Sequence, residues 1–374
     1  MNDDLLGGLD YETFFRDYWQ KRPLLVRNAL PGFSGLIDPE ALFKLSTSEE
    51  ALSRLVFQQD RIWRLEHGPF KRKRFQLADL DNAWTLLVQE LNHHLHGAEQ
   101  FLQRFDFIPH ARLDDLMVSY APAGGGVGPH FDSYDVFLIQ GMGSRRWQIS
   151  AQKDLELMDG LPLKILRNFI PEMEWILTPG DLLYLPPHYA HNGIAMDECM
   201  TYSVGFRAPS TQEMATQFLV YMQDKLDLPG QYQDPDLAWQ THSGEIAEGM
   251  ITKIAGMIGQ IQWDRADIAD FIGRYLTEPK AHVFFRPPVR PLSMAAFCKQ
   301  VASCGLRLAP QSQLLFHGER YYLNGMPFDV PMRERLQIMA DTRKIAPEQF
   351  DVASISQFYQ GYLDGYFLID KKNI

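Results

Sequence analysis

The sequence predicts an α+β protein of two or three domains, with its strands gathered in the middle of the chain. Its 374 residues exceed the length at which one hydrophobic core usually keeps growing. Short apolar runs bounded by Gly and Pro crowd between residues 114 and 206, whereas apolar residues at helical spacing dominate after Pro209. A hydrophobic content of 45% and a charged content of 22% are ordinary for a globular protein.

The N-terminal part is expected to brace the central strands. Residues 10–20 predict a helix that begins after Asp10, because four aromatic side chains fall on one helical face. Next come a strand, a short helix, a hairpin that turns at residues 58–60 and one long helix, expected at residues 24–26, 39–45, 55–65 and 84–105.

The central part predicts strands separated by tight turns. Residues 124–129 (GGGVGP) form a loop in which the backbone can turn sharply. Residues 135–140 (DVFLIQ) predict a buried strand, and residues 146–150 (RWQIS) predict the strand that returns beside it after a turn. Residues 176–185 predict two further strands joined by a Pro-Gly turn.

After Pro209 the chain predicts helices and then a mixed part. A capping box at residues 210–213 opens the first of three helices, expected at residues 210–226, 244–263 and 264–276. Their apolar stripes favour a bundle, a homodimer interface or both. A proline-rich linker at residues 287–291 precedes a helix, two strands joined by a turn and a last helical segment, expected at residues 292–303, 313–316, 320–323 and 347–368.

The net charge of −11 argues against broad nucleic-acid binding and suits a basic partner, although acidity also serves solubility. Residues 286–374 carry 11 basic and 8 acidic side chains, a net charge of +3. Helices with a β-wing in this part resemble a winged helix. Because its basic footprint is weak, we expect it to contact protein and not DNA.

The cysteine content and the hydropathy of the sequence indicate in which cellular compartment the protein is expected. The three cysteines, at positions 199, 298 and 304, lack zinc-site spacing and are odd in number, so they are expected to be reduced thiols. The sequence has no apolar run long enough to cross a membrane and no basic-apolar leader. We therefore expect a cytoplasmic protein without a membrane span.

One stretch carries the residue types of a metal centre. His130 and Asp132 stand two residues apart at the entrance of a strand, so both side chains can point to one face. With His191, which follows a proline-rich turn, they make a 2-His-1-carboxylate set, which binds non-haem Fe(II) and leaves coordination positions open. His-x-Asp alone is more often a surface or hydrogen-bonded pair. His188 is the rival histidine, but the two prolines before it make a helical His-x-x-His pair unlikely, and we place it at the rim.

Three segments around this motif carry a family resemblance: DDLMVSYAPAGGGVGPHFDSYDVFLIQGMGSRRWQI, PGDLLYLPPHYAHNG and YSVGFRAP. They resemble the JmjC domain of the 2-oxoglutarate-dependent oxygenases, and more closely the bacterial ribosomal oxygenases. The resemblance runs along the whole chain. It implies a double-stranded β-helix barrel of the cupin or jelly-roll type with N-terminal helices, a helical dimerisation domain and a winged-helix-like domain, over residues 1–208, 209–286 and 287–374.

The resemblance also implies roles for single residues. His130, Asp132 and His191 match the iron ligands, and Arg145 matches the basic residue that pairs with the distal carboxylate of 2-oxoglutarate. A guanidinium can hold a carboxylate through two parallel hydrogen bonds. Ser119, Thr201 and Ser203 are candidates for further contacts of this co-substrate, and the alternative for each is an ordinary sheet residue. The bacterial relatives often carry a hydroxyl residue where this chain has Ala121, so one expected contact is in doubt.

The positions that contact the target guanidinium in the family match Asp115 and Tyr134. A carboxylate can accept hydrogen bonds from an arginine, and an aromatic face can pack on its guanidinium. Met117 lies two residues after Asp115, so it can line the same slot.

Taken together, the resemblance implies an oxygenase that uses Fe(II), 2-oxoglutarate and dioxygen to hydroxylate an arginine of a large-subunit ribosomal protein, the one numbered sixteen. Metal and co-substrate carry the oxidation, so no further catalytic residue is expected. Two alternatives stay open. The chain could be a JmjC oxygenase acting on a histidyl residue or a methyl-lysine, or it could be a cupin regulator without activity whose winged helix binds DNA.

Overall fold

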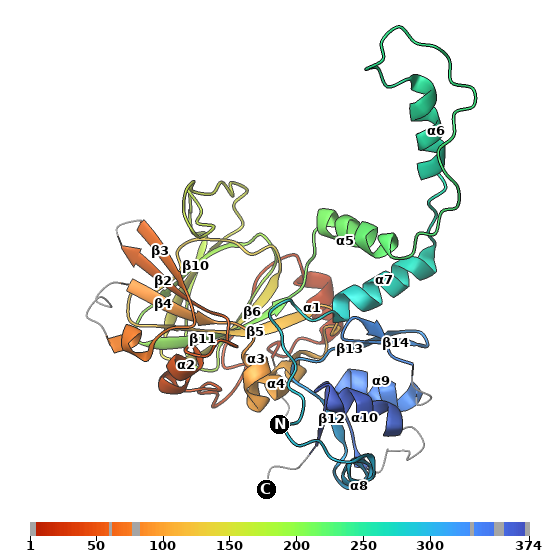
Figure 1. Cartoon of the computed structure of the whole chain (residues 1–374). Coiled ribbons are helices and arrows are strands. Elements are labelled where there is room, and N and C mark those ends of the chain that lie inside the picture. Colours follow the sequence, from red (N-terminus) through yellow and green to blue (C-terminus); the bar gives the residue numbers. More distant parts are fainter. Residues whose placement is uncertain (1–4, 60–61, 77–82, 330–332, 348–354, 371–374) are drawn as a thin grey trace. The chain divides into compact units, whose positions relative to one another are not determined.

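A computed structural model of the chain describes residues 5–59, 62–76, 83–329, 333–347 and 355–370 (Figure 1). The chain divides into two compact units. The first comprises Met1–Ala208, Lys280–Ser312 and Glu334–Ile374, and the second comprises Pro209–Pro279 and Gln313–Arg333. All residues that the sequence assigns to the site belong to the first unit.

An eight-stranded antiparallel sheet forms the main wall of the first unit, in the order β1-β9-β6-β11-β5-β4-β2-β3. Its strands are β1 Leu24–Val26, β2 Ser53–Gln59, β3 Ile62–His67, β4 Ala83–Val88, β5 Leu113–Ala121, β6 Asp135–Met142, β9 Leu182–Leu185 and β11 Cys199–Phe206. β11 lies between β5 and β6 and pairs with both, so the last strand of the barrel joins segments that are distant in the sequence.

A second sheet of three antiparallel strands has the order β10-β7-β8, with β7 Arg145–Ser150, β8 Met173–Leu177 and β10 Ala190–Ala195. The two sheets share one buried apolar cluster, formed by Val136, Leu138, Leu183 and Leu185 of the large sheet and Trp147, Ile149 and Leu177 of the small one. They therefore pack face to face around a common interior, as expected of the predicted barrel.

β5 and β11 each have an apolar face and a more polar face. The apolar face joins the main core through Leu116, Val118, Tyr120, Met200, Tyr202 and Val204. Because side chains alternate along a strand, the intervening residues point to the interior of the barrel. This inner face carries the predicted site residues Asp115, Met117, Ser119, Thr201 and Ser203.

The first unit also contains short helices: α1 Tyr11–Asp17, α2 Pro39–Leu45, α3 Leu91–His94 and α4 His96–Leu102, with 3-10 turns η1 Arg72–Gln76 and η3 Gln103–Phe105. Asp10 caps α1 as predicted, because its side chain accepts a hydrogen bond from the N–H of Thr13 at 2.7 Å. The predicted strand β1, helix α2 and hairpin β2–β3 are confirmed, whereas the turn residue Asp60 lies outside the described residues.

The long helix predicted over residues 84–105 is wrong in its first part. Ala83–Val88 form strand β4 between β2 and β5, and helix begins only at Leu91. All residues of β4 from Trp84 onward are buried. A strand that is buried on both faces shows a continuous apolar run, which periodicity cannot distinguish from a buried helix.

The prediction that residues 146–150 return beside residues 135–140 is also wrong. β6 pairs with β9 and β11, whereas β7 pairs with β10 and β8 in the other sheet. β8 and β9, which a Pro-Gly turn joins, likewise lie in different sheets. A tight turn reverses the chain, but in a barrel it can pass the chain from one sheet to the other.

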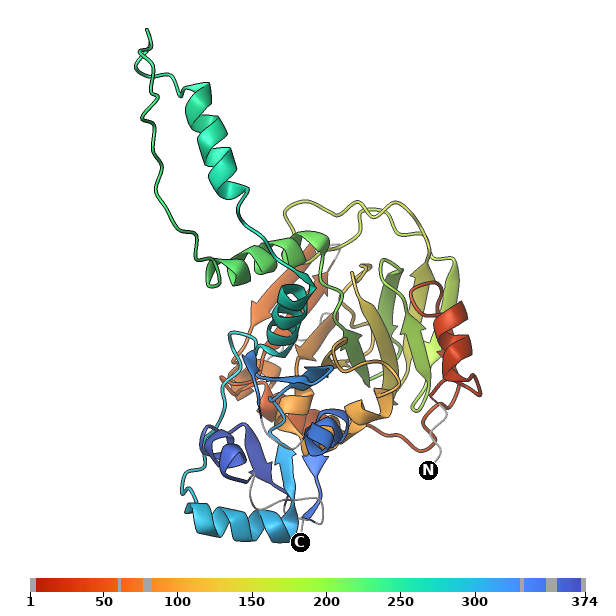
Figure 2. The same ribbon diagram turned by 90° about the vertical axis from the view of Figure 1, so that its right-hand side faces the viewer.

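The second unit contains helices α5 Thr211–Gln223, α6 Glu248–Ile258 and α7 Arg265–Thr277, and the small sheet of β13 Leu314–His317, β14 Arg320–Leu323 and β15 Met326–Pro327. Ser210 caps α5, and Asp264 and Asp267 form a capping box at α7. The chain reaches α6 through residues 224–247, a long segment without helix or strand (Figures 1 and 2).

The remaining part of the chain contains α8 Met294–Cys304, β12 Leu306–Leu308, α9 Arg333–Thr342, β16 Lys344–Ile345, α10 Ile355–Leu363 and β17 Phe367–Ile369. Of the helix predicted at residues 347–368, residues 348–354 lie outside the described residues. Helix α10 ends at Leu363, and a strand follows it. The three cysteines are free thiols, as predicted. No helix among the described residues is long and apolar enough to cross a membrane.

Candidate metal centre

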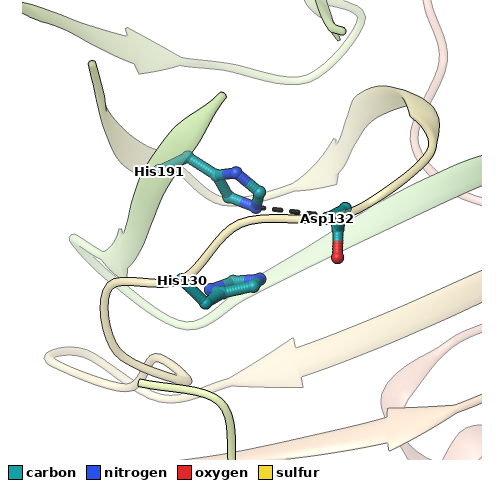
Figure 3. Close-up of side chains that lie close together, drawn as sticks. All are labelled: His130, Asp132 and His191. Atoms are coloured by element: carbon teal, nitrogen blue, oxygen red, sulfur yellow. Dashed lines mark ion pairs between the residues drawn. The ribbon is translucent and has the colours of Figure 1, made fainter. Parts of the chain in front are cut away.

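Three side chains converge in the first unit (Figure 3). His130, Asp132 and His191 each offer one ligand atom, and these atoms lie within 4.8 Å of one another. His191 belongs to β10, while His130 and Asp132 precede β6. The backbone N–H of His130 donates to the carbonyl of His191 at 2.9 Å, and that of His191 donates back at 2.8 Å. This two-way bridge brings together residues that are far apart in the chain.

Both histidines have their second ring nitrogen engaged. Nδ1 of His130 lies 2.9 Å from the carbonyl of Gly128, and Nδ1 of His191 lies 2.9 Å from the carbonyl of Tyr189. A carbonyl can only accept, so in the neutral rings Nδ1 carries the proton and Nε2 keeps its lone pair. Metal-bound histidines commonly make this second contact, which fixes the tautomer and the ring orientation.

The surroundings keep His191 in the form that binds a metal. Its side chain is buried, and burial, followed by the nearby His130, lowers the pKa of His191 to about 4. Nε2 of His191 lies 3.7 Å from Oδ2 of Asp132. The set thus offers two imidazole nitrogens and a carboxylate oxygen, the donor types typical of a non-haem iron site.

His188 does not join this cluster. It adopts a left-handed backbone conformation with φ 63° after the two prolines, and its N–H donates to the carbonyl of Asp132 at 2.7 Å. Its ring lies beside Phe131, with 5.7 Å between the ring centroids. The turn thus holds the backbone of Asp132 and leaves the cluster to His191.

Arg145 enters the barrel interior from β7. Its side chain is 5% exposed, and its Nη1 donates to Oγ of Ser119 across the interior at 3.4 Å. Its Nε and Nη2 are buried and have no hydrogen-bond partner among the residues that the structure describes. A buried guanidinium with free donors is strongly unfavourable unless an anion pairs with it. This side chain therefore fits an anionic ligand such as a carboxylate, as the metal-binding set fits a divalent ion.

Matches to known proteins agree with this arrangement. A family model described as JmjC domain matches residues 100–214, and one described as ROXA-like winged helix matches residues 260–366. The ribosomal protein uL16 3-hydroxylase of Escherichia coli is 34% identical over 353 residues, which cover 91% of each protein. A probable ribosomal oxygenase of Haemophilus influenzae is 40% identical over 232 residues, or 60% of this chain and 54% of that protein.

Solved structures extend the match to three dimensions. The X-ray structure of E. coli YcfD has a TM-score of 0.85 and 31% identity, covering 96% of this chain and 98% of that one. YcfD in complex with cobalt and 2-oxoglutarate has a TM-score of 0.82 and 30% identity, covering 97% and 99%.

The chain belongs to the JmjC-domain ribosomal oxygenases. The predicted barrel with a C-terminal winged helix is thereby confirmed. The winged-helix match begins inside the part that the sequence assigns to the helical domain, so the boundary between residues 286 and 287 stays a prediction.

Two of the candidate co-substrate residues of this ribosomal oxygenase already donate their hydroxyl protons to other groups of the protein. The hydroxyl of Thr201 donates to Oε1 of Gln140 at 2.9 Å, and that of Ser119 donates to the carbonyl of Thr201 at 3.3 Å. Ser203 lies directly opposite Met117 on the inner face. Ala121 is fully buried against Ala195 and Cys199, so it adds only apolar surface.

The side chains of Asp115 and Tyr134 both lie near Gly205. A Cβ added at Gly205 would stand 3.6 Å from Oδ1 of Asp115 and 3.8 Å from Cε2 of Tyr134. Asp115 is buried and Tyr134 is 41% exposed. Burial, followed by the charge of Asp114, raises the pKa of Asp115 to about 6. A carboxylate and an aromatic ring therefore both lie close to this glycine.

Sequence reasoning missed the residues that support Asp115. The backbone N–H of Glu90 donates to Oδ2 of Asp115 at 3.0 Å. The Glu90 carboxylate itself pairs with Lys280 at 3.0 Å and His282 at 2.8 Å, and Lys280 also pairs with Asp114 at 2.9 Å. Burial opposes the charge of Glu90, but the contact with His93 and the charges of His93 and Lys280 outweigh it and lower its pKa. No sequence pattern links residues 90, 115 and 280.

Proposed function

We propose that this ribosomal oxygenase uses Fe(II), 2-oxoglutarate and dioxygen to hydroxylate an arginine side chain of the large-subunit ribosomal protein uL16. The observation that carries the proposal is Arg145. It places a buried guanidinium with free donors in the same barrel interior as the set of His130, Asp132 and His191. A cupin that served only as a binding module would have no use for such a group.

His130, Asp132 and His191 would hold the metal, and Arg145 would pair with the distal carboxylate of 2-oxoglutarate. Metal and co-substrate supply the oxidising chemistry when bound. The residues of the chain orient the two partners. The apolar cluster of Trp147, Ile149 and Leu177 lines the interior beside them and keeps water away.

An arginine target is supported by the slot over Gly205. Asp115 can accept hydrogen bonds from a guanidinium, and the Tyr134 ring can pack on its face. Asp115 with a pKa of about 6 is mostly ionised at neutral pH, which favours a cation over a neutral histidine. The choice of uL16 is supported by the name of the E. coli relative, which aligns over 91% of its length.

Peptides decide between arginine and its rivals. The protein, Fe(II) and 2-oxoglutarate are incubated with a uL16 peptide, a histidine-bearing ribosomal peptide and a methyl-lysine peptide, and mass spectrometry follows. We expect the uL16 peptide to gain one oxygen atom on arginine and succinate to form, with no reaction by His130→Ala. A gain on histidine or a loss of methyl would identify another JmjC activity. If none of the peptides is modified and no succinate forms, the result would contradict the oxygenase proposal.

We also propose that the protein is a cytoplasmic homodimer that joins through its second unit. None of the residues of α6, all of which the structure describes, is buried. Its exposed apolar side chains are Met250, Ile251, Ile254, Met257 and Ile258. An amphipathic helix with an uncovered apolar face is typical of an interface, and a second copy of this chain would supply a matching helix.

A further inference from the structure

Thr85 carries a buried hydroxyl group and is not one of the residues assigned to the candidate metal centre. It lies on β4 and is fully buried. Its Oγ1 has no hydrogen-bond partner among the described residues. Buried hydroxyls almost always find a partner, and leaving one unsatisfied is unfavourable, so this oxygen needs an explanation.

The strand register places Thr85 inside the barrel. β4 pairs with β5 so that Leu86 lies opposite Tyr120 and Leu87 opposite Ser119. Side chains two residues apart share a face, so Thr85 points to the same side as Leu87 and Ser119. One further step of the register sets Thr85 beside Ala121. Gly125 supports this, because a Cβ there would come within 2.3 Å of the Trp84 carbonyl and 2.9 Å of the Ala121 Cβ.

Arg145 reaches the same end of the interior. Its Nη1 contacts Oγ of Ser119 at 3.4 Å. Its partner across the small sheet is Ala195, which packs against Ala121. The Arg145 side chain thus starts beside Ala195 and reaches Ser119 on β5, the strand that pairs with the strand of Thr85. The two groups leave free donors on neighbouring walls, Nε and Nη2 on one and Oγ1 on the other.

The neighbouring hydroxyls are less available. Ser119 donates its proton to the carbonyl of Thr201, and Thr201 donates its own to Gln140. Ala121, on the same inner face, carries no hydroxyl. A ligand carboxylate beside Arg145 would thus find a free hydroxyl donor at Thr85.

We propose that Thr85 donates a hydrogen bond to the distal carboxylate of 2-oxoglutarate and supplies from β4 the hydroxyl that Ala121 lacks on β5. This inference rests on the proposed function, because it names a further contact of the same co-substrate. A hydroxyl and a guanidinium on adjacent walls hold the two oxygens of one carboxylate in a fixed orientation.

The test compares full-length wild type with Thr85→Val and Thr85→Ser, each loaded with Mn(II) so that no turnover occurs, and measures 2-oxoglutarate binding by calorimetry. Valine keeps the shape of threonine and removes the hydroxyl. We expect Thr85→Val to weaken binding about tenfold, the effect of one hydrogen bond to a charged group. Thr85→Ser should bind like wild type. Binding by Thr85→Val that matches wild type would overturn the proposal.

Melting of the unliganded proteins separates a binding role from a structural one. Replacing an unpaired buried hydroxyl by a methyl of the same shape should leave the Tm of Thr85→Val equal or higher. The matched control is Thr201→Val, which removes a hydroxyl that donates to Gln140 and should lower the Tm. A lowered Tm of Thr85→Val with unchanged 2-oxoglutarate affinity would show a structural hydroxyl and refute the inference. Absence of binding by the wild type would instead contradict the proposed function as a whole, and the inference with it.

Discussion

At the scale of single residues, Asp132 is the one anionic group of the metal-binding set, and it alone can offset part of the charge of a divalent ion. We predict that Asp132→Ala lowers the affinity for Fe(II) or Mn(II) at least about 100-fold, since loss even of an outer contact commonly costs 10–100-fold. Metal content after dialysis, measured by plasma mass spectrometry, checks this. His188→Ala is the matched control and should keep its metal. Retention of metal by Asp132→Ala would place the ion elsewhere.

The buried carboxylate of Asp115 should lower the free energy of unfolding at neutral pH. Its folded pKa of about 6 lies above the ordinary 3.8, so its ionisation disfavours the folded state. The stability linked to this group is full below pH 3.8 and is lost as the pH rises through about 6. We therefore predict that Asp115→Asn raises the free energy of unfolding at pH 7 by at most about 3 kcal/mol.

Urea unfolding of wild type and Asp115→Asn at pH 4 and pH 7 measures this difference. The increase in the free energy of unfolding caused by Asp115→Asn should be present at pH 7 and nearly absent at pH 4. The same variant should bind the arginine peptide more weakly than wild type at pH 7. An equal effect at both pH values would show that Asp115 does not titrate as described.

The convergence of His130, Asp132 and His191 could be predicted because their signals are local. His130 and Asp132 have strand spacing, and the prolines before His188 exclude the helical alternative. The state of Asp115 could not be predicted in this way. Its burial and its contact with Glu90 depend on a strand and a turn that come together only in the folded chain.

At the scale of elements, the turn between β4 and α3 supports Asp115, because the backbone N–H of Glu90 donates to its carboxylate. Glu90 adopts a left-handed backbone conformation with φ 54°, and its buried carboxylate accepts from Lys280 and His282. We predict that Glu90→Gln lowers the free energy of unfolding by about 1–3 kcal/mol, because the lysine is partly exposed and a fully buried pair would cost more.

Denaturant unfolding checks the Glu90 prediction, and Glu156→Gln serves as its control. Glu156 pairs with Arg167 with 59% of its side chain exposed, so this change should stay within about 0.5 kcal/mol of wild type. Equal effects of the two substitutions would mean that the buried cluster contributes no more than a surface pair.

Element types could be predicted where one face is exposed or a cap is present, as in α1, α2 and α7. Strand β4 could not be predicted, because burial on both faces removes the alternation of apolar and polar residues that marks a strand. The partners of β6 and β7 could not be read from their turn, because closure of the barrel decides pairing and local sequence does not.

At the scale of the whole molecule, the exposed apolar face of α6 predicts association. Ile251 and Ile254 are 49% and 37% exposed within one chain. Sedimentation of the wild type should give a particle of twice 43.1 kDa, and Ile251→Asp with Ile254→Asp should give single chains. The exposed Val289 lies outside α6, so Val289→Asp is the control and should stay dimeric. A wild type that sediments as one chain at micromolar concentration would contradict the homodimer.

In the proposed enzyme, one metal ion held by three side chains and one carboxylate held by Arg145 share the interior of the barrel. An anaerobic titration of the Fe(II)-loaded protein with 2-oxoglutarate, followed by charge-transfer absorption, tests it most directly. We predict that the wild type shows a saturable charge-transfer band and that His130→Ala shows none. For Arg145→Met, the 2-oxoglutarate concentration at half saturation should be at least about tenfold higher than for the wild type. Absence of the band from the wild type, or equal saturation of wild type and Arg145→Met, would contradict the account.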